Sequence, residues 1–210
     1  MSKNAQSTRR WYAVVLAAML SYLAPTVTAQ GRDEFRIQPG TSVTVQVGKG
    51  GLFSFAGHEH EVVAPATEGR IALDRGDITK STVRLVFDAT AMKVTGKGEP
   101  AEDVPEVQRV MMSDRVLDPQ RYPTITFESR MISRASASSI RIAGDLTLHG
   151  TTKRVDVPVE LRLEADRLTA QGKVNIRQSD FGIRPVTAAG GSVRVKDDVT
   201  VTFAISASRP

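Results

Sequence analysis

The residues best suited to chemistry lie in one short stretch, GLFSFAGHEHEV, at positions 51–62. This stretch holds two of the three histidines of the chain, His58 and His60, one residue apart and each next to a glutamate. On a strand, alternate side chains share a face, so both imidazoles would point the same way as Val62. Such a pair could ligate a metal, contact the polar head of a ligand, or lie on a solvated strand end.

A metal site would need further ligands, because zinc takes three or four from the protein. On a strand, the remaining histidine, His149, would point to the face opposite that of Leu146 and Leu148. We therefore expect it to face outward or to lie in a turn. We therefore expect His58 and His60 to contact a polar head group. A metal site that combines them with a carboxylate is the alternative.

The sequence motifs of common catalytic sites do not occur in this chain. It has no cysteine, no Gly-x-Ser-x-Gly turn and no glycine-rich phosphate loop leading into a helix. Asp180, in SDFGI, could orient a histidine, but an aspartate beside Phe181 and Gly182 is typical of a turn. The sequence predicts a protein that is not an enzyme and needs no cofactor. A hydrolase or isomerase with His58 or His60 as its base is the weaker alternative.

The first 29 residues have the composition of a secretory leader. Lys3, Arg9 and Arg10 precede the apolar run WYAVVLAAMLSYL, and the small residues of APTVTA follow it. The run is too short to span a membrane, which takes roughly 20 residues. We expect a signal peptide at 1–29, cut after its last alanine, and a soluble domain at 30–210 that is periplasmic or secreted.

Loss of this leader changes the charge and the aromatic content. Three basic and no acidic residues lie in it, so the formal net charge falls from +5 to +2. The tryptophan and two of the three tyrosines also lie there, which leaves Tyr122. A nucleic-acid partner is not expected, because basic stripes and stacking aromatics are both missing. Without cysteine, the domain has no disulfides to stabilise it.

Apolar and polar residues alternate through most of the remaining chain. In RVDVPVELRL, every second residue from Val155 to Leu163 is apolar. In TITFESRM, the same period would direct Ile125, Phe127 and Met131 inward. A period of two predicts antiparallel strands with one buried face. The segments with this pattern are 41–47, 81–87, 124–131, 139–148, 154–163, 172–176 and 199–205.

One segment, at 105–117, has helical spacing instead. Val107, Val110 and Met111 recur on one face, and Pro105 suits a first helical turn. Polar turns separate the strands, among them DRGD at 74–77, HGTT at 149–152 and KDD at 196–198. About eight strands and one short helix in a crossover predict a single all-β antiparallel domain. Closure into a β-barrel is favoured because it leaves no exposed strand edges.

Several blocks of the sequence resemble the bacterial YceI-like family in order and spacing. They are TSVTVQV, VLDPQRYPTITFES, GDLTLHGTTKRVDVPVEL, RQSDFGIRPV and VKDDVTVTFAISA, and they cover nearly all of residues 34–208. The resemblance implies an exported, lipocalin-like barrel. It also implies a carrier for a long-chain amphiphile, such as a polyisoprenoid, a quinone-like molecule or a fatty acid derivative.

A barrel that holds such a tail needs an apolar lining with few polar atoms. Methionine suits a lining because its side chain adapts its shape. The same residues could instead fill the barrel as a solid core, and the protein would then act by contacting other envelope proteins. A homodimer is also left open. The candidate lining residues are Phe53, Phe55, Phe87, Met111, Met112, Phe127, Leu148 and Phe181.

Overall fold

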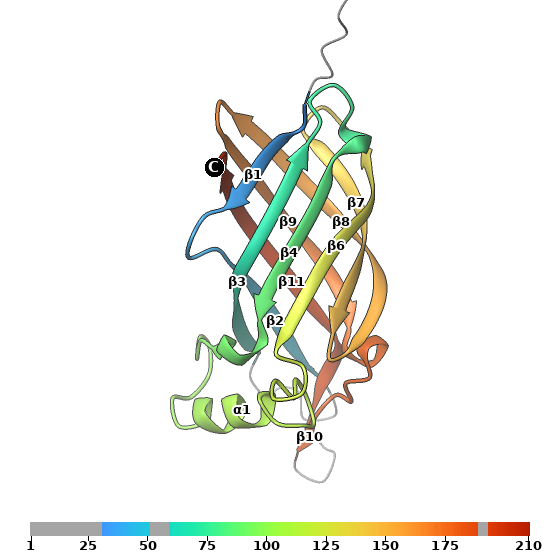
Figure 1. The fold of residues 1–210 in the computed structure, drawn as a ribbon. Coiled ribbons are helices and arrows are strands. Elements are labelled where there is room, and N and C mark those ends of the chain that lie inside the picture. The colour runs from blue at the N-terminus through green and yellow to red at the C-terminus, as the bar shows by residue number, and fades with distance from the viewer. Residues whose placement is uncertain (1–30, 51–58, 189–192) are drawn as a thin grey trace, which may run out of the picture.

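The computed structural model describes residues 31–50, 59–188 and 193–210, and these form a closed antiparallel barrel of eight strands (Figure 1). Closure comes from β11, which pairs with β2 on one side and with β9 on the other. The predicted all-β barrel is confirmed. The barrel strands are β2 (Ser42–Gly50), β3 (His60–Leu73), β4 (Thr82–Asp88), β6 (Thr124–Arg134), β7 (Ser139–Leu148), β8 (Thr151–Glu164), β9 (Arg167–Arg177) and β11 (Val193–Ser208).

Short elements complete the wall and the two ends. β1 (Asp33–Ile37) pairs with β3 and β11 beyond the end of β2, so β1 and β2 occupy one position in the wall. β5 (Lys93–Val94) pairs with β3, and β10 (Thr187–Ala188) pairs with β11. We call the end that carries the β3–β4 turn the upper end. The single-turn helices are η2 (Ile78–Lys80), η3 (Ala89–Ala91) and η4 (Gln178–Phe181).

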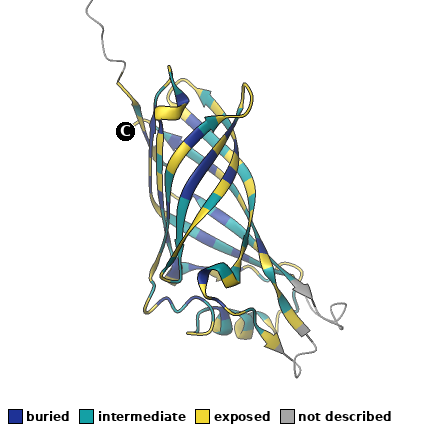
Figure 2. Ribbon diagram, turned by 90° about the vertical axis from the view of Figure 1, so that its right-hand side faces the viewer, coloured by how far each residue is buried: buried dark blue, intermediate teal, exposed yellow. Residues whose placement is uncertain are grey.

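The helix α1 (Val104–Met111) lies across the lower end of the barrel (Figures 1 and 2). It contains Pro105 in its first turn, as predicted, but it ends before the predicted residue 117. The Ser113 hydroxyl donates to the carbonyl of Val110 at 2.6 Å, and this local bond competes with further helical bonds. No helix in the described ranges is long and apolar enough to cross a membrane.

A β-bulge overturns one inward prediction on β6. The register of β6 with β7 shifts between Ser129 and Met131, so Arg130 is an extra residue in the strand. The inward series therefore passes from Phe127 to Ile132, which is buried, and Met131 is 64% exposed. The prediction that Met131 lines the interior is wrong, because a single inserted residue reverses the faces of all that follow.

At two further register shifts, the sequence pattern did not predict the full length of the strand. In β3 the register with β4 shifts between Ala66 and Glu68. Before the shift the inward side chains stand at even positions such as Val62, and after it they stand at odd positions such as Ile71. The full length of β3 therefore shows no continuous alternation. The segment KDD at 196–198 was expected to be a turn. It lies inside β11, where the register with β2 shifts between Val195 and Val199.

The upper end of the barrel is a packed core. Phe35, Ile132, Leu168 and Ala207 are almost completely buried there and come from four different strands. Along β8, from Arg154 to Glu164, exposed residues alternate with less exposed ones, and Figure 2 shows bands of both kinds on the barrel wall. Ladder hydrogen bonds and these side chains hold the upper half of the barrel together.

One close approach in the wall gives a test of this packing. A β-carbon at Gly144 would lie 2.5 Å from the Phe127 ring and 2.8 Å from the Glu128 carbonyl oxygen. We expect Gly144→Ala to lower the free energy of unfolding by about 1–3 kcal/mol, because the ring has to move. Urea unfolding measures this, with Gly31→Ala as the control, since no atom lies within 4 Å of that β-carbon. Equal unfolding midpoints for the two variants would contradict the packing described.

Candidate functional site

The barrel encloses a cavity of about 240 Å³. One water molecule needs roughly 10–15 Å³ of such space, so this is much larger than a packing void. All eight barrel strands contribute to its lining, and every lining side chain is apolar except Ser81 and Gln178. The predicted lining residues that border it are Phe87, Met111, Phe127 and Leu148.

The cavity borders side chains of both halves of the barrel, from Ile132 and Leu168 in the upper half to Ile176 in the lower half. Inward residues there are mainly valines, such as Val45, Val174 and Val201, and they are only half-buried. An eight-stranded barrel is just wide enough to be filled by side chains, so short valines leave space at its axis. On β9 the lining extends from Leu168 to Ile176, roughly 26 Å along the strand at ~3.3 Å per residue. The cavity is therefore long and narrow.

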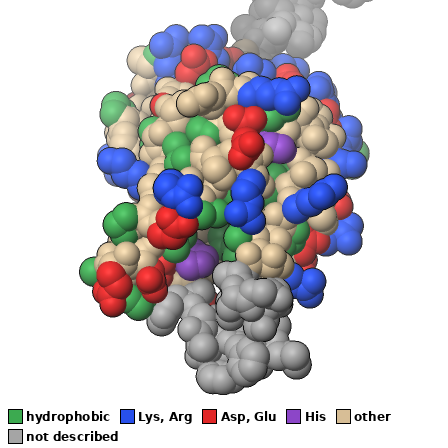
Figure 3. Space-filling model, turned by 90° about the horizontal axis from the view of Figure 1, so that it is seen from below, with side chains coloured by type: hydrophobic (Ala, Val, Ile, Leu, Met, Phe, Trp, Pro, Cys, Tyr) green, Lys and Arg blue, Asp and Glu red, His purple; other side chains and the backbone are tan. Residues whose placement is uncertain are grey.

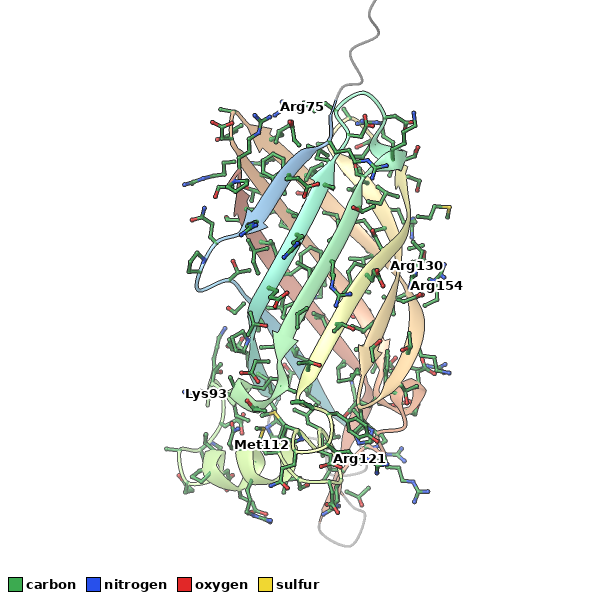
Figure 4. The ribbon with its side chains drawn as sticks, viewed as in Figure 1. Arg75, Lys93, Met112, Arg121, Arg130 and Arg154 are labelled. Carbon is green, nitrogen blue, oxygen red and sulfur yellow. The ribbon has the colours of Figure 1, made fainter. Side chains whose placement is uncertain are left out.

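The other predicted lining residues lie elsewhere. Phe53 and Phe55, like His58 and the predicted leader at 1–29, lie outside the described residues. Met112 follows α1 at the lower end and is not part of the cavity lining (Figure 4). Phe181 is 1% exposed but borders an outer groove between β8 and β9 instead of the cavity.

His60 forms a buried polar pair at the lower end of the barrel. Its side chain points inward, like that of Val62 two residues later, which lines the cavity. The Nδ1 atom of His60 lies 3.0 Å from Oε2 of Glu99. The Glu99 side chain is only 1% exposed. The two groups are at ion-pair distance, but within the described ranges neither Glu99 oxygen nor the His60 Nδ1 has a hydrogen-bond partner. A buried acceptor without a donor is costly, so a hydrogen-bond donor for Glu99 would stabilise this end of the barrel.

The loop that carries Glu99 is fastened to β3. The Thr95 N–H donates to the Glu61 carbonyl at 2.8 Å, and Lys97 forms an ion pair with the Glu61 carboxylate at 3.2 Å. Glu99 could not be singled out from the sequence, because a glutamate between Gly98 and Pro100 looks like any loop carboxylate. Only the folding of this loop over the inward side of β3 buries it.

The described residues do not assemble a metal site. Among them, no group of three or more His, Cys, Asp or Glu side chains is arranged to hold an ion. His149 lies in the two-residue turn between β7 and β8, where it and Gly150 both have positive φ angles, so its predicted place in a turn is confirmed. Its ring packs edge-on against Tyr122 at 4.7 Å, and its Nδ1 lies 3.3 Å from the Phe181 carbonyl oxygen.

The outer wall carries an ion network across three strands. Asp145 of β7 lies between Arg130 of β6, at 2.7 Å, and Arg154 of β8, at 2.8 Å. The two arginines lie near one another on the same side of the barrel (Figure 4). Hydrogen bonds from Arg130 and then Arg154 hold the pKa of the Asp145 carboxyl below its usual value. Exposed pairs of this kind contribute little to stability, so the network orients the wall and is not a binding site.

Seen from below, apolar side chains are visible in a hollow near the centre of the lower face, with charged side chains around it (Figure 3). The geometry is thus an apolar cavity with a buried polar pair towards one end. The family model for the YceI-like domain matches residues 35–207. This chain belongs to the YceI-like family.

A curated relative of this YceI-like chain is a UPF0312 protein of Pseudomonas aeruginosa. It is 33% identical over 85 residues, which are 38% of this chain and 44% of the relative. The matched stretch thus covers less than half of the relative's length.

Solved structures share the barrel at low sequence identity. BcnA of Burkholderia cenocepacia has a TM-score of 0.64 and 19% identity, and the match covers 80% of this chain and 96% of BcnA. A polyisoprenoid binding domain from Saccharophagus degradans, implicated in plant cell wall breakdown, has a TM-score of 0.60 and 14% identity, over 85% and 99% of the two chains. The YceI protein of Campylobacter jejuni has a TM-score of 0.55 and 16% identity, over 70% and 81%. At these identities, the likeness shows the YceI-like fold alone.

The hollow lower half can be tested by filling it. We expect Val201→Phe to cost less than about 1 kcal/mol of unfolding free energy, because its ring would enter the cavity. The matched change Val94→Phe, at a buried position that does not border the cavity, should cost about 1–3 kcal/mol. Urea unfolding of both variants measures the difference, and a larger loss for Val201→Phe would contradict a hollow lower half.

Proposed function

We propose that this YceI-like protein is a binding protein that holds the apolar tail of a long-chain amphiphile inside its barrel. The observation that carries the proposal is the long cavity lined almost entirely by apolar side chains. Such a lining offers no hydrogen bonds to a polar substrate, but it suits an alkyl or isoprenoid chain. A polyisoprenoid, a quinone-like molecule or a fatty acid derivative has a tail of this kind.

The energetics favour a long tail. Each methylene moved from water into the cavity contributes roughly 0.8 kcal/mol, so a tail with about ten buried methylenes would gain about 8 kcal/mol before the costs of association. Short ligands would not overcome these costs without polar contacts. The cavity therefore favours ligands by the length of their apolar part.

The two ends of the barrel give the ligand a direction. The packed core around Phe35 and Leu168 blocks the upper end, so the tail would point upward from the hollow lower half. The polar head would then lie near His60 and Glu99, where buried polar atoms lack partners among the described residues. In this arrangement His60 keeps its predicted head-group role and Glu99 is added to it.

Binding, and not catalysis, is the activity that we propose, with no cofactor besides the ligand. A leader at 1–29 would place the mature protein in the periplasm or outside the cell. A long-chain amphiphile is poorly soluble there, and a barrel that shields its tail could carry or store it.

Native mass spectrometry of the protein, purified without detergent, tests the proposal first. We expect a co-purifying organic mass that is released on denaturation. A protein that carries no such mass should still bind a fluorescent prenol saturably, and Val201→Phe should weaken this binding at least tenfold because its ring occupies the cavity. Met131→Phe is the control, since that residue is exposed on the outer wall. A metal-sized mass instead, or no saturable binding, would refute the proposal.

Glu99 gives a separate prediction about the head group. A buried carboxylate can accept a hydrogen bond from a hydroxyl head but repels an anionic one. We expect the protein to bind a prenol more tightly than the prenyl phosphate of equal length, and Glu99→Gln to reduce this preference by roughly tenfold, about 1.4 kcal/mol. Competition titrations measure the preference. Glu102→Gln, at an exposed position of the same loop, is the control. An equal preference in all three proteins would remove Glu99 from the head-group site.

A further inference from the structure

The barrel wall is interrupted between the lower halves of β8 and β9. These strands pair from Glu164 and Arg167 down to Glu160 and Gln171, and no lower pair joins them. Below that point β8 continues to pair with β7, and β9 with β11. In the described part of the wall, residues 151–159 and 172–177 therefore face one another without a ladder between them.

Pro158 accounts for the place where the ladder stops. A β-carbon on Gly172 would lie 2.3 Å from the Pro158 carbonyl oxygen, so this carbonyl points towards β9. In an antiparallel strand the N–H and C=O of one residue point to the same neighbour, so the donor that proline lacks is the one that would have reached β9. Pro158 thus ends the pairing of β8 with β9, although β8 itself continues as a strand.

A groove of about 400 Å³ occupies the gap on the outer side of the wall. Polar side chains from both strands form its rim, including Asp156 and Asn175. Three inward side chains, Val155, Val174 and Ile176, line both this groove and the inner cavity. Because the same three side chains border the two spaces, they form part of the wall between the cavity and the groove.

Phe181 lies in this groove and belongs to η4. Its ring is buried there, and Gln178 of the same single-turn helix borders the inner cavity. Ser179 holds η4 to β11, because its N–H and hydroxyl donate to the Asp197 carboxylate at 2.8 and 2.5 Å. These bonds from Ser179 also hold the pKa of Asp197 below its usual value. Gly182, at a φ of 75°, ends η4 and allows the chain to turn away.

Two other routes into the cavity would run along the barrel axis. The upper end is filled by Phe35 and the buried residues around it. The lower end is crossed by α1, which Gln108 fastens to the barrel, since its side chain accepts from the Val94 N–H at 2.8 Å and donates to the Met92 carbonyl at 3.0 Å. A tail that passed between β8 and β9 would displace neither the core nor α1.

We propose that the gap between the lower halves of β8 and β9 is a lateral portal, through which the tail of the amphiphile enters and leaves the cavity, and that Phe181 is its plug. This inference rests on the proposed function. The rim carries charges of both signs, Lys153, Arg154 and Arg177 against Asp156, Asp180 and Asp198. A polar head group could stay solvated along this rim while the tail slides past Val155 and Val174.

Paired cysteines test the portal, because the chain has no cysteine of its own. Asp156→Cys with Asn175→Cys places thiols opposite one another across the gap, in the register that the paired residues of β8 and β9 set. A disulfide closes the gap where the thiols meet, and a bis-maleimide closes it where they are further apart. The control is Arg162→Cys with Thr169→Cys, which are already paired in the ladder.

The readout is transfer of dansyl-labelled farnesol between phosphatidylcholine vesicles and the protein. We expect the closed gap to slow transfer at least tenfold, with the equilibrium Kd changed less than threefold and the rate restored when the disulfide is reduced. The cross-linked control should transfer the probe at the wild-type rate. An unchanged rate with the gap closed and binding intact would overturn the portal alone. No binding to the wild-type protein would overturn the proposed function and the portal together.

Phe181→Ala tests the plug without cross-linking. We expect transfer to become about tenfold faster, because the ring no longer fills the gap. Circular dichroism and thermal unfolding establish whether the variant is folded. A folded variant with the wild-type transfer rate would show that Phe181 is not the plug.

Discussion

Closure of the barrel by β11 is the constraint on which the rest of the structure depends. This strand of 16 residues pairs with β9 along most of its length and with β2 on its other edge. A closed wall forces each inward side chain to meet others across the axis, so side-chain size decides whether the interior is solid or hollow. Phe35 fills the upper end and the larger Ile132 and Leu168 border the cavity beside it, whereas half-buried valines border the cavity in the lower half.

The polar groups of the molecule divide into two kinds. On the outer wall, pairs such as Asp145 with Arg130 and Arg154 are exposed to water, and their contribution to stability is small. At the lower end, Glu99 is buried beside His60 and has no donor among the described residues. Burial of that kind lowers stability, so its presence next to an apolar cavity favours a role in ligand recognition.

A carrier has to shield its ligand and also exchange it, and the wall reflects both needs. Continuous ladders shield the tail, but a fully paired barrel would release it only through its ends. The missing donor of Pro158 removes pairing over one stretch, where inward valines separate the cavity from the outer groove. The proposed portal thus follows from a single residue type in one strand.

Alternation along the sequence was enough to determine most strands and the barrel class, and Pro105 located the start of the helix. The turn at His149 followed from the HGTT segment at 149–152, whereas strand parity alone left an outward position open as well. These features are local, because period and turn chemistry depend on neighbouring residues. The exposure of Met131, the full extent of β3, the burial of Glu99 and the gap beside Pro158 could not be predicted. Each depends on how one strand or loop pairs with another far away in the sequence. The hollow, too, was decided only by the tertiary structure, since a cavity wall and a solid core have the same sequence pattern.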